Sequence, residues 1–580
     1  MKRRFELDTS RIVKLTTRVF LISAIAVLIC NVLAISRDYQ DSWVLEGLEI
    51  PFLLFAVALA LTFFSEKRIS ALVVIAIVSR IVFLLIPNLK YVWFQGVYID
   101  QHQQYNLASY VVATGRILPG PISASFTFYA LSPLLHLLFS IFSIVLNVPV
   151  VNSMKYVPVL FSPIYPLITY AIMKKMELTQ ESSITKYALF LSGIPIARSD
   201  YIIGGITFGI LLAFIILFLL VAILRKNDRR YWFVCLIFVI ALAAAHSATS
   251  IILTGLLLLI LTLKRVPYFR SKSYLRASVV LTVALVSLTW LMFQAYFNFE
   301  IIVRAFSAMV PTGTTPPSDY IPSTFFQLAR VEPLAAAETF LVFFGTHLFL
   351  LILALAGLAI MSKMSKTLNN ASSFLMFLLV LTVAIIILGV FIRLGPTRAL
   401  PFDELLFPIF CGTAVFYLGR KRKWIRALLF ASIMLLATVQ FYGCQPLIPP
   451  ANLIYAGLPA SVPIGYVNNV NSIFQRRVVS FALSHVVVGV VASDPTTYNQ
   501  MLGVADFSFM SLHFINYYPI DTQEPQQRYD LLIIHVPGKA GILEEKANLR
   551  TPDLILQTVY NSDVVYTNGE SYMLAHYPQP

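Results

Sequence analysis

Long apolar runs recur along most of this chain, from residue 19 to residue 443. An α-helix needs about 20 apolar residues to cross the hydrocarbon core of a bilayer. Only 12% of the residues are charged, whereas a soluble domain has about 25%. The sequence therefore predicts a polytopic, all-α membrane bundle.

The apolar runs are separated by short polar segments, and each is expected to form a helix. About 13 of them are expected to be transmembrane helices, given the length needed for a crossing. The runs cover residues 19–36, 51–64, 69–87, 132–147, 154–173, 187–202, 203–224, 231–246, 248–263, 277–297, 341–361, 371–392, 404–419 and 427–443.

Basic residues account for the formal net charge of +15. They fall in short clusters between the apolar runs, at 2–4, 174–175, 225–230, 264–265 and 420–423. Such clusters are typical of cytoplasmic loops, where they meet anionic lipid headgroups. This pattern predicts a cell-membrane protein with a cytoplasmic N-terminus, and it argues against a nucleic-acid partner.

The charge pattern leaves one part of the topology open. Residues 88 and 203 are both expected outside, yet three apolar runs lie between them. One run must therefore be re-entrant or interfacial, either 132–147 or 187–202. The first choice puts Lys174, Lys175 and Lys186 in the cytoplasm, as the charge rule favours, and the second puts them outside.

Three parts of the chain are expected to differ in organisation. Residues 1–68 hold the N-terminus and an additional transmembrane hairpin, and residues 69–443 form the main bundle with outer loops at 88–131 and 298–340. Residues 444–580 are expected to form a small extracytoplasmic α/β domain. Its strand-like segments are 485–493, 529–537 and 562–567, and its helix-like segments are 543–549 and 551–560.

A polar cluster, DQHQQ at 100–104, stands in the first outer loop. If this stretch is helical, Gln103 and Gln104 share a face with Asp100, and Leu107, Val111 and Val112 continue it as an interfacial helix. Asp100, beside His102 and the amides, could act as a general base or bind a divalent metal. The alternative is a solvated loop carboxylate.

Two further polar residues lie where apolar runs end on the outer side. Asp200 stands between two runs, at a depth where acidic residues are costly and mark functional sites, although it could equally cap the helix at 203–224. His246 is followed by Ser247, Thr249 and Ser250, and could bind a sugar or phosphate. Alternatively, His246 is a core histidine that forms hydrogen bonds within the protein.

Arg393 and Arg398 are cations on the outer side, where the charge rule disfavours them. A guanidinium binds phosphate through two hydrogen bonds. Arg393 belongs to an apolar run, whereas Arg398 lies on a turn between Gly395-Pro396 and Pro401. The alternative for Arg398 is an ion pair with Asp403 or Glu404.

The order of these features resembles the GT-C superfamily of integral-membrane glycosyltransferases, which includes oligosaccharyltransferases and protein O-mannosyltransferases. The resemblance covers about residues 69–443. It rests on Asp100 with QYNLASYVVATGRI, on FYALSPLLHLL with Tyr129, Pro133 and His136, on ITYAIMKKM, on Asp200 in ARSDY, on His246, on Arg398 and on a trailing outer domain. A single Asp stands at 200 where a paired acidic motif is usual, and the tail has no WWDYG-like motif.

The resemblance implies a membrane enzyme that takes a sugar from a polyprenyl-phosphate donor at the outer leaflet. The acceptor would be a protein, a glycan or a lipid. It implies catalytic roles for Asp100 and Asp200, and substrate-binding roles for His102, Gln104, Tyr129, His246 and Arg398. The resemblance does not determine the cofactor. The candidate is a divalent metal ion, Mg²⁺ or Mn²⁺, which Asp100 and Asp200 would hold.

Two other classes of protein are compatible with the composition. A transporter or flippase of a lipid-linked or anionic substrate would also place polar residues in the membrane, but it predicts inverted repeats, and no internal repeat is visible. A non-catalytic scaffold with a partner-binding tail leaves Asp100, Asp200 and Arg398 without a role.

Overall fold

The structure is a computed structural model of the whole chain, and it describes most of the helical part together with five strands of the tail. The described residues are 15–26, 29, 54–63, 65–90, 99–117, 131–176, 181–195, 205–226, 229–263, 277–295, 345–363, 370–391, 400–421, 423–443, 489–493, 512–516, 531–535, 563–567 and 571–575.

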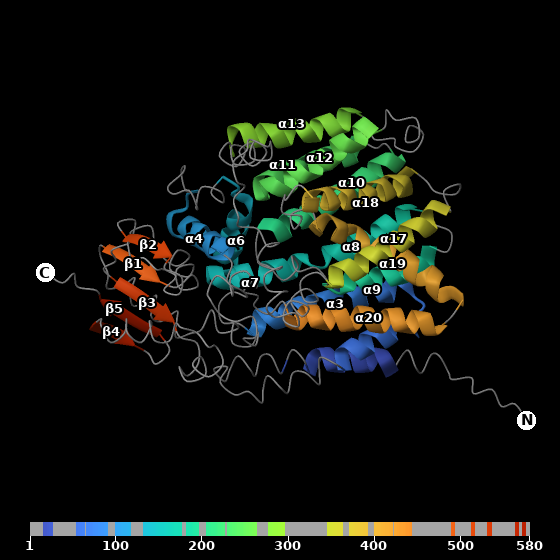
Figure 1. Cartoon of the computed structure of the whole chain (residues 1–580), viewed down its shortest axis with the longest axis horizontal. Coiled ribbons are helices and arrows are strands. Elements are labelled where there is room, and N and C mark those ends of the chain that lie inside the picture. The colour runs from blue at the N-terminus through green and yellow to red at the C-terminus, as the bar shows by residue number, and fades with distance from the viewer. Residues whose placement is uncertain are drawn as a thin grey trace, which may run out of the picture.

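Nearly every expected apolar run appears as a helix, and the helices pack side by side in one bundle (Figure 1). Two N-terminal helical segments, Leu15–Ala26 and Leu54–Phe63, precede the labelled helices. These are α3 (Ile69–Lys90), α4 (Ile99–Thr114), α6 (Leu134–Leu146), α7 (Val150–Phe161), α8 (Ile164–Met176), α9 (Glu181–Gly193), α10 (Gly205–Lys226), α11 (Arg229–Ala245), α12 (Ser247–Leu263), α13 (Ala277–Phe293), α17 (Thr346–Lys363), α18 (Asn370–Phe391), α19 (Leu400–Lys421) and α20 (Lys423–Gly443).

The outer surface of the bundle is apolar. Large hydrophobic side chains on widely separated helices are more than 60% exposed, among them Ile22, Val145, Phe233 and Phe293. A water-soluble monomer rarely exposes apolar surface on this scale, so these side chains face lipid. By length and hydropathy alone, two helical stretches of the described residues could span a membrane, Val150–Met176 and Gly205–Arg225.

The centre of the bundle is α9, which packs against α3, α8 and α19. Ala188, Leu189 and Phe190 of α9 are at most 1% exposed. Glycines allow the close approach, since a Cβ on Gly412 would lie 2.7 Å from the backbone nitrogen of Ala188. Small residues let helices pack tightly in membranes, where lipid is as apolar as the protein.

Prolines change two of the expected helices. The run 154–173 forms two helices, α7 and α8, because Pro163 cannot continue the helical hydrogen bonding and the chain breaks at Ser162–Pro163. The expected span 187–202 is wrong in its bounds: the helix is Glu181–Gly193. It starts earlier in ESSITK and ends shortly before Pro195, since the residue before a proline disfavours helix.

Side chains from the basic clusters meet at one end of the bundle. Arg225 donates from Nη1 to the carbonyl oxygen of Lys175 at 2.8 Å, and Lys186 donates from Nζ to the carbonyl oxygen of Glu66 at 2.8 Å. Arg426 donates from Nη1 to the hydroxyl oxygen of Tyr187 at 3.0 Å. The described residues of the segments 65–68, 174–186, 225–230 and 420–426 therefore lie on the same side, which we call the basic end.

The tail contains a five-stranded mixed sheet in the order β2-β1-β3-β5-β4. Its strands are β1 (Gly489–Ser493), β2 (Leu512–Asn516), β3 (Leu531–His535), β4 (Asp563–Thr567) and β5 (Ser571–Ala575). Strand β1 pairs in parallel with β2 and β3, and β5 pairs antiparallel with β3 and β4. Strands β1, β3 and β4 fall inside the three strand-like segments, whereas β2 and β5 were missed.

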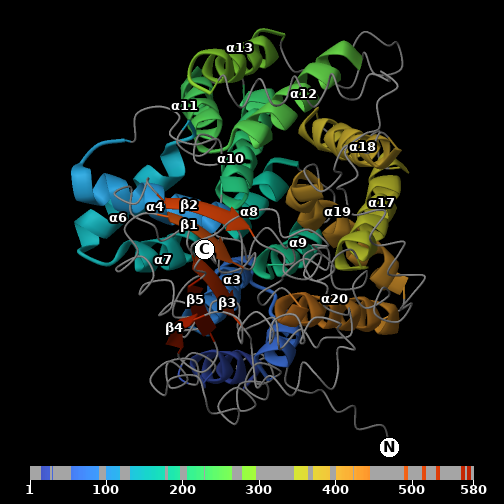
Figure 2. The ribbon, with the colours of Figure 1, turned by 60° about the vertical axis from the view of Figure 1, so that its left-hand side comes forward.

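The sheet lies at the end of the bundle where α4, α6 and α7 pack together (Figures 1 and 2). The helix-like segments 543–549 and 551–560 lie outside the described residues, so the α/β class of this domain stays a prediction. The helix count and the domain boundaries also stay predictions.

The basic end gives a test of which segment fails to cross the membrane. Because Lys175 and Lys186 both lie there, we expect α7 and α8 together to form one crossing and α6 to form none. In a background without the four native cysteines, Pro149→Cys should react with an impermeant maleimide only from outside, and Lys174→Cys only from the cytoplasm. The reverse pattern would mean that α6 crosses and the span at 187–202 does not.

Helix packing predicts opposite effects for two glycines in apolar helices. A Cβ on Gly357 of α17 would overlap the carbonyl oxygen of Phe410 in α19, whereas a Cβ on Gly255 of α12 meets nothing within 4 Å. We expect Gly357→Ala to lower stability by about 1–3 kcal/mol through overpacking. Gly255→Ala should be neutral or stabilising by up to about 1 kcal/mol, as thermal unfolding in detergent will show. Equal effects would contradict the α17–α19 contact.

Candidate functional site

The first outer helix, α4, carries the polar cluster and is anchored on the bundle. It begins at Ile99, so Asp100 stands in the first turn, where the helix dipole favours negative charge. Helix α4 packs against α6 and α7, and Ser140 of α6 donates from its hydroxyl to the carbonyl oxygen of Ala108 at 3.0 Å. The expected helix is therefore present, its position at the membrane interface stays a prediction, and the side chains of Asp100 and His102 lie outside the described part.

The buried face of α4 is formed by Gln104, Leu107, Ala108 and Val111. Val112, which the sequence named with Leu107 and Val111 as continuing this helix, is 38% exposed. It follows Val111 by one residue, and a step of one residue turns a helix by about 100°. Gln104 is four residues after Asp100, so both residues stand on the same side of the helix.

Gln104 and His136 are fully buried polar side chains on the two contacting helices α4 and α6. Neither the amide atoms of Gln104 nor the ring nitrogens of His136 have a hydrogen-bond partner among the described residues. Leaving such a group unsatisfied costs about 1–3 kcal/mol, which makes the α4–α6 contact a candidate place for polar recognition. Sequence reasoning named His136 only as part of a motif and assigned it no role.

Three segments that carry candidate residues meet around His246. The hydroxyls of Ser132 and Ser247 are 3.1 Å apart, and a Cβ on Gly205 would lie 3.0 Å from Cδ2 of the His246 ring. Tyr129, Asp200 and Arg398 themselves are outside the described residues.

His246 has a structural role at the junction of α11 and α12. Its Nδ1 lies 2.6 Å from the hydroxyl oxygen of Thr249 and accepts a hydrogen bond from the Thr249 backbone N–H at 3.3 Å. Because α12 begins at Ser247, His246 occupies the N-cap position and satisfies one of the unpaired N–H groups of the first turn. This contact supports the structural alternative raised from the sequence.

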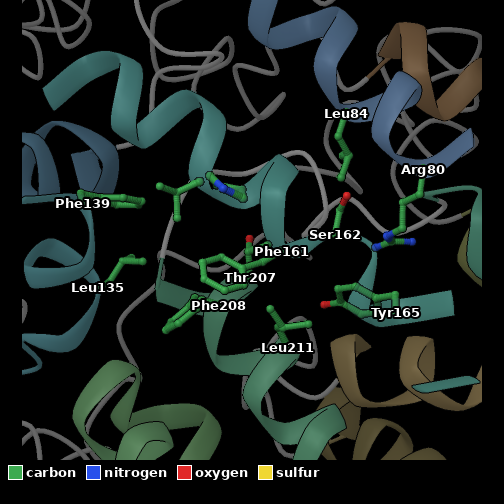
Figure 3. A pocket seen from close by; sticks show the side chains of 12 residues that line it. Arg80, Leu84, Leu135, Phe139, Phe161, Ser162, Tyr165, Thr207, Phe208 and Leu211 are labelled. Atoms are coloured by element: carbon green, nitrogen blue, oxygen red, sulfur yellow. The ribbon is translucent and has the colours of Figure 1, made fainter. Parts of the chain in front are cut away.

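A narrow cavity opens between α3, α6, α7, α8 and α10 (Figure 3). The cavity itself has a volume of about 30 Å³, which leaves room for little more than a water molecule. Its lining is mostly aliphatic and aromatic, with polar groups from Arg80, Ser162, Tyr165 and Thr207. The remaining lining residues are Leu84, Leu135, Phe139, Val157, Pro158, Phe161, Phe208 and Leu211.

The described residues contain no group of three His, Cys, Asp or Glu side chains that could hold a metal ion. The two carboxylates that the sequence proposes as ligands, Asp100 and Asp200, are not among the described side chains. The divalent metal therefore stays a prediction. Cys235 and Cys411 are buried inside helices, as small core residues are.

No protein-family model and no curated protein matches the sequence. Solved structures do match the fold. The oligosaccharyltransferase of Archaeoglobus fulgidus, in complex with Zn and sulfate, matches with a TM-score of 0.50 and 12% identity, over 87% of this chain and 73% of that chain. The mycobacterial arabinofuranosyltransferase AftD has a TM-score of 0.46 and 12% identity, over 87% of this chain and 41% of that one. ArnT from Cupriavidus metallidurans has a TM-score of 0.43 and 11% identity, over 88% and 99%.

The chain thus has the GT-C fold, the class of polytopic membrane architecture that its motifs resemble. At this level of identity the similarity concerns the fold alone.

The capping role of His246 predicts how substitutions will behave. We expect His246→Ala to lower the thermal stability of the purified protein, by about 0.5–2 kcal/mol as for other lost caps. His246→Asn should keep most of the stability, because an asparagine amide can accept the same hydrogen bond. If both variants unfold like the wild type in detergent, His246 does not cap α12.

Proposed function

We propose that this protein is a membrane glycosyltransferase that moves a sugar from a polyprenyl-phosphate donor to an acceptor at the outer face of the membrane. The proposal is carried by one observation. In a GT-C fold, the described segments that adjoin Tyr129 and Asp200 meet at His246. Helix α11 ends beside His246 and contacts α6. Helix α6 in turn packs against α4, the helix that carries Asp100. Described parts of the chain that adjoin four candidate residues thus lie near one another, which supports the proposal that these residues share one site.

The proposed chemistry divides between acidic and basic residues. Asp100 accepts the proton of the acceptor hydroxyl as its oxygen attacks the anomeric carbon, with Asp200 as the second catalytic carboxylate. The bond between that carbon and the phosphate oxygen breaks, and its electron pair leaves with the polyprenyl phosphate. Arg398 binds this phosphate, because a fixed cation placed where negative charge grows lowers the barrier.

The remaining candidates would bind the sugar and the acceptor. His102, Gln104, Tyr129 and His246 offer hydrogen-bonding groups to hydroxyls, and the unused amide of Gln104 supports this role most directly. Mg²⁺ or Mn²⁺ would be held by Asp100 and Asp200, since carboxylate oxygens suit such cations. The acceptor is a protein, a glycan or a lipid.

The proposed setting is the cell membrane, with the N-terminus in the cytoplasm and the C-terminal domain outside. The grouping of basic segments at the end formed by α8, α9 and α20 supports this orientation. The sheet lies at the end of the bundle that carries α4 (Figures 1 and 2), on the side where the transfer is proposed.

The direct test is transfer by the purified protein in proteoliposomes. Polyprenyl-phosphate donors with labelled sugars are offered with peptide, glycan and lipid acceptors, and Asp100→Asn serves as the inactive control. Label on an acceptor that is lost with Asp100→Asn supports the proposal. Movement of the intact donor across the bilayer without transfer would instead indicate the flippase class.

The two outer arginines give a sharper prediction about the donor phosphate. Arg398 lies in the segment that connects α18, ending at Phe391, with α19, beginning at Leu400. Lysine keeps the positive charge but cannot form the bidentate hydrogen bonds that a guanidinium makes to a phosphate. We expect Arg398→Lys to lower the transfer rate by roughly tenfold or more, and Arg393→Lys to change it little.

Both variants are compared at equal amounts of folded protein, with the rate of label transfer as the readout. Equal losses, or a larger loss for Arg393→Lys, would remove Arg398 from the donor site.

A further inference from the structure

The contact between α4 and α6 buries two polar side chains that the packing leaves unsatisfied. Gln104 of α4 and His136 of α6 are both fully buried. Among the described residues, neither the two amide atoms of Gln104 nor the two ring nitrogens of His136 have a hydrogen-bond partner. Polar atoms that are buried in this way lose their hydrogen bonds to water and gain none in return, so their presence needs an explanation.

Hydroxyl groups at the same contact do find partners, so the packing there is not poor in general. Ser140 of α6 donates to the carbonyl oxygen of Ala108 in α4 at 3.0 Å. Ser153 of α7 donates to the carbonyl oxygen of Phe139 in α6 at 2.7 Å. Both hydroxyl side chains are at most 3% exposed. Within this described contact, it is the amide and the imidazole that are left without partners.

Gln104 and His136 lie near one point of the contact. Gln104 comes four residues before Ala108 in α4, and the hydrogen bond from Ser140 ends at Ala108. His136 comes four residues before Ser140 in α6. Each polar side chain therefore stands about one helical turn, or roughly 5.4 Å, from the same hydrogen bond. Asp100, the proposed base, stands one further turn before Gln104 on the same side of α4.

The chemistry of the two side chains favours a ligand with neutral hydroxyl groups. An amide offers donors and an acceptor, and a neutral imidazole offers one donor and one acceptor. A hydroxyl group also donates and accepts, so neighbouring hydroxyls can satisfy both side chains. The oxygens of a phosphate or carboxylate only accept, and they would leave the amide oxygen and one ring nitrogen unpaired.

We propose that Gln104 and His136 bind hydroxyl groups of the transferred sugar and so determine which sugar the protein accepts. His136 is then a further substrate-binding residue. The inference rests on the proposed function, because it names the part of the substrate that this contact binds. Both side chains are sealed from solvent, so the sugar reaches them when α4, which packs against α6 and α7, moves away from α6.

A structural role for both residues is the competing explanation. Buried polar residues that serve the fold are hydrogen-bonded, and their removal lowers stability. Residues that are kept for a ligand instead lower the stability of the ligand-free protein, as functional sites often do. Apolar side chains of similar shape should then stabilise it. The two explanations predict opposite changes in stability.

The first measurement is the melting temperature in detergent without donor. We expect Gln104→Leu and His136→Phe each to raise it by about 1–3 °C, because they remove unsatisfied polar atoms. Ser140→Ala is the matched control at the same contact. It removes a hydrogen bond that is formed, so it should lower the melting temperature.

The second measurement is sugar selectivity in the proteoliposome assay. The probes are the labelled donor that the wild type accepts and its monodeoxy analogues, each without one sugar hydroxyl. We expect the wild type to transfer at least one deoxy sugar roughly tenfold more slowly, because the missing hydroxyl leaves a buried polar group unpaired. This preference should be largely lost in Gln104→Leu and His136→Phe, and Ser140→Ala should keep it.

The inference is overturned if both variants keep the wild-type preference, or if both melt at lower temperature or fail to fold. Either result leaves the proposed function standing, because the wild type still transfers sugar. If the wild type transfers no sugar from any donor, the proposed function fails, and this assignment of the ligand fails with it.

Discussion

The bundle depends on how helix ends inside a membrane are satisfied. Lipid offers no hydrogen bonds, so the free carbonyl and N–H groups of each helix end need partners within the protein. Three helix-terminal carbonyls are bonded by cations: Ser192 by Arg80, Lys175 by Arg225 and Gly419 by Arg426. At a helix N-terminus, the start of α12, the ring of His246 accepts a hydrogen bond from the backbone N–H of Thr249.

These contacts also set the two functional ends of the molecule. Arg225 and Arg426, with Lys186, hold the basic end together, and the charge rule predicts that this end lies in the cytoplasm. The contact between Ser132 and Ser247, and the packing of Gly205 on His246, join the segments that carry the candidate site. The break between α7 and α8 borders a small cavity, which is lined by Arg80 and by Thr207 and Phe208 next to the His246 region.

Much of the bundle could be predicted from the sequence, because long apolar runs permit only helices in lipid. The expected helix after Asp100 is present as α4; of the apolar residues named as continuing it, Leu107 and Val111 are buried and Val112 is 38% exposed. The strand-like segments likewise predicted β1, β3 and β4, since alternating β-branched residues indicate strands. The fold class that the motifs resemble, GT-C, is the one that the solved structures share.

Features set by contacts between distant residues could not be predicted. The break at Pro163 was missed because hydropathy alone does not register a proline inside an apolar run. The burial of Gln104 and His136, and the place of Arg80 in the cavity, depend on which helices become neighbours. The roles of Asp100, Asp200 and Arg398 stay predictions.

The central claim is that transfer takes place at the outer face, and sealed membrane vesicles of defined orientation test it most directly. A labelled polyprenyl-phosphate sugar is placed in the bilayer, and a membrane-impermeant acceptor is added only to the external medium. The account predicts transfer in right-side-out vesicles and little in sealed inside-out vesicles until they are permeabilised. Transfer that occurs only in sealed inside-out vesicles, with the acceptor on the cytoplasmic side, would contradict it.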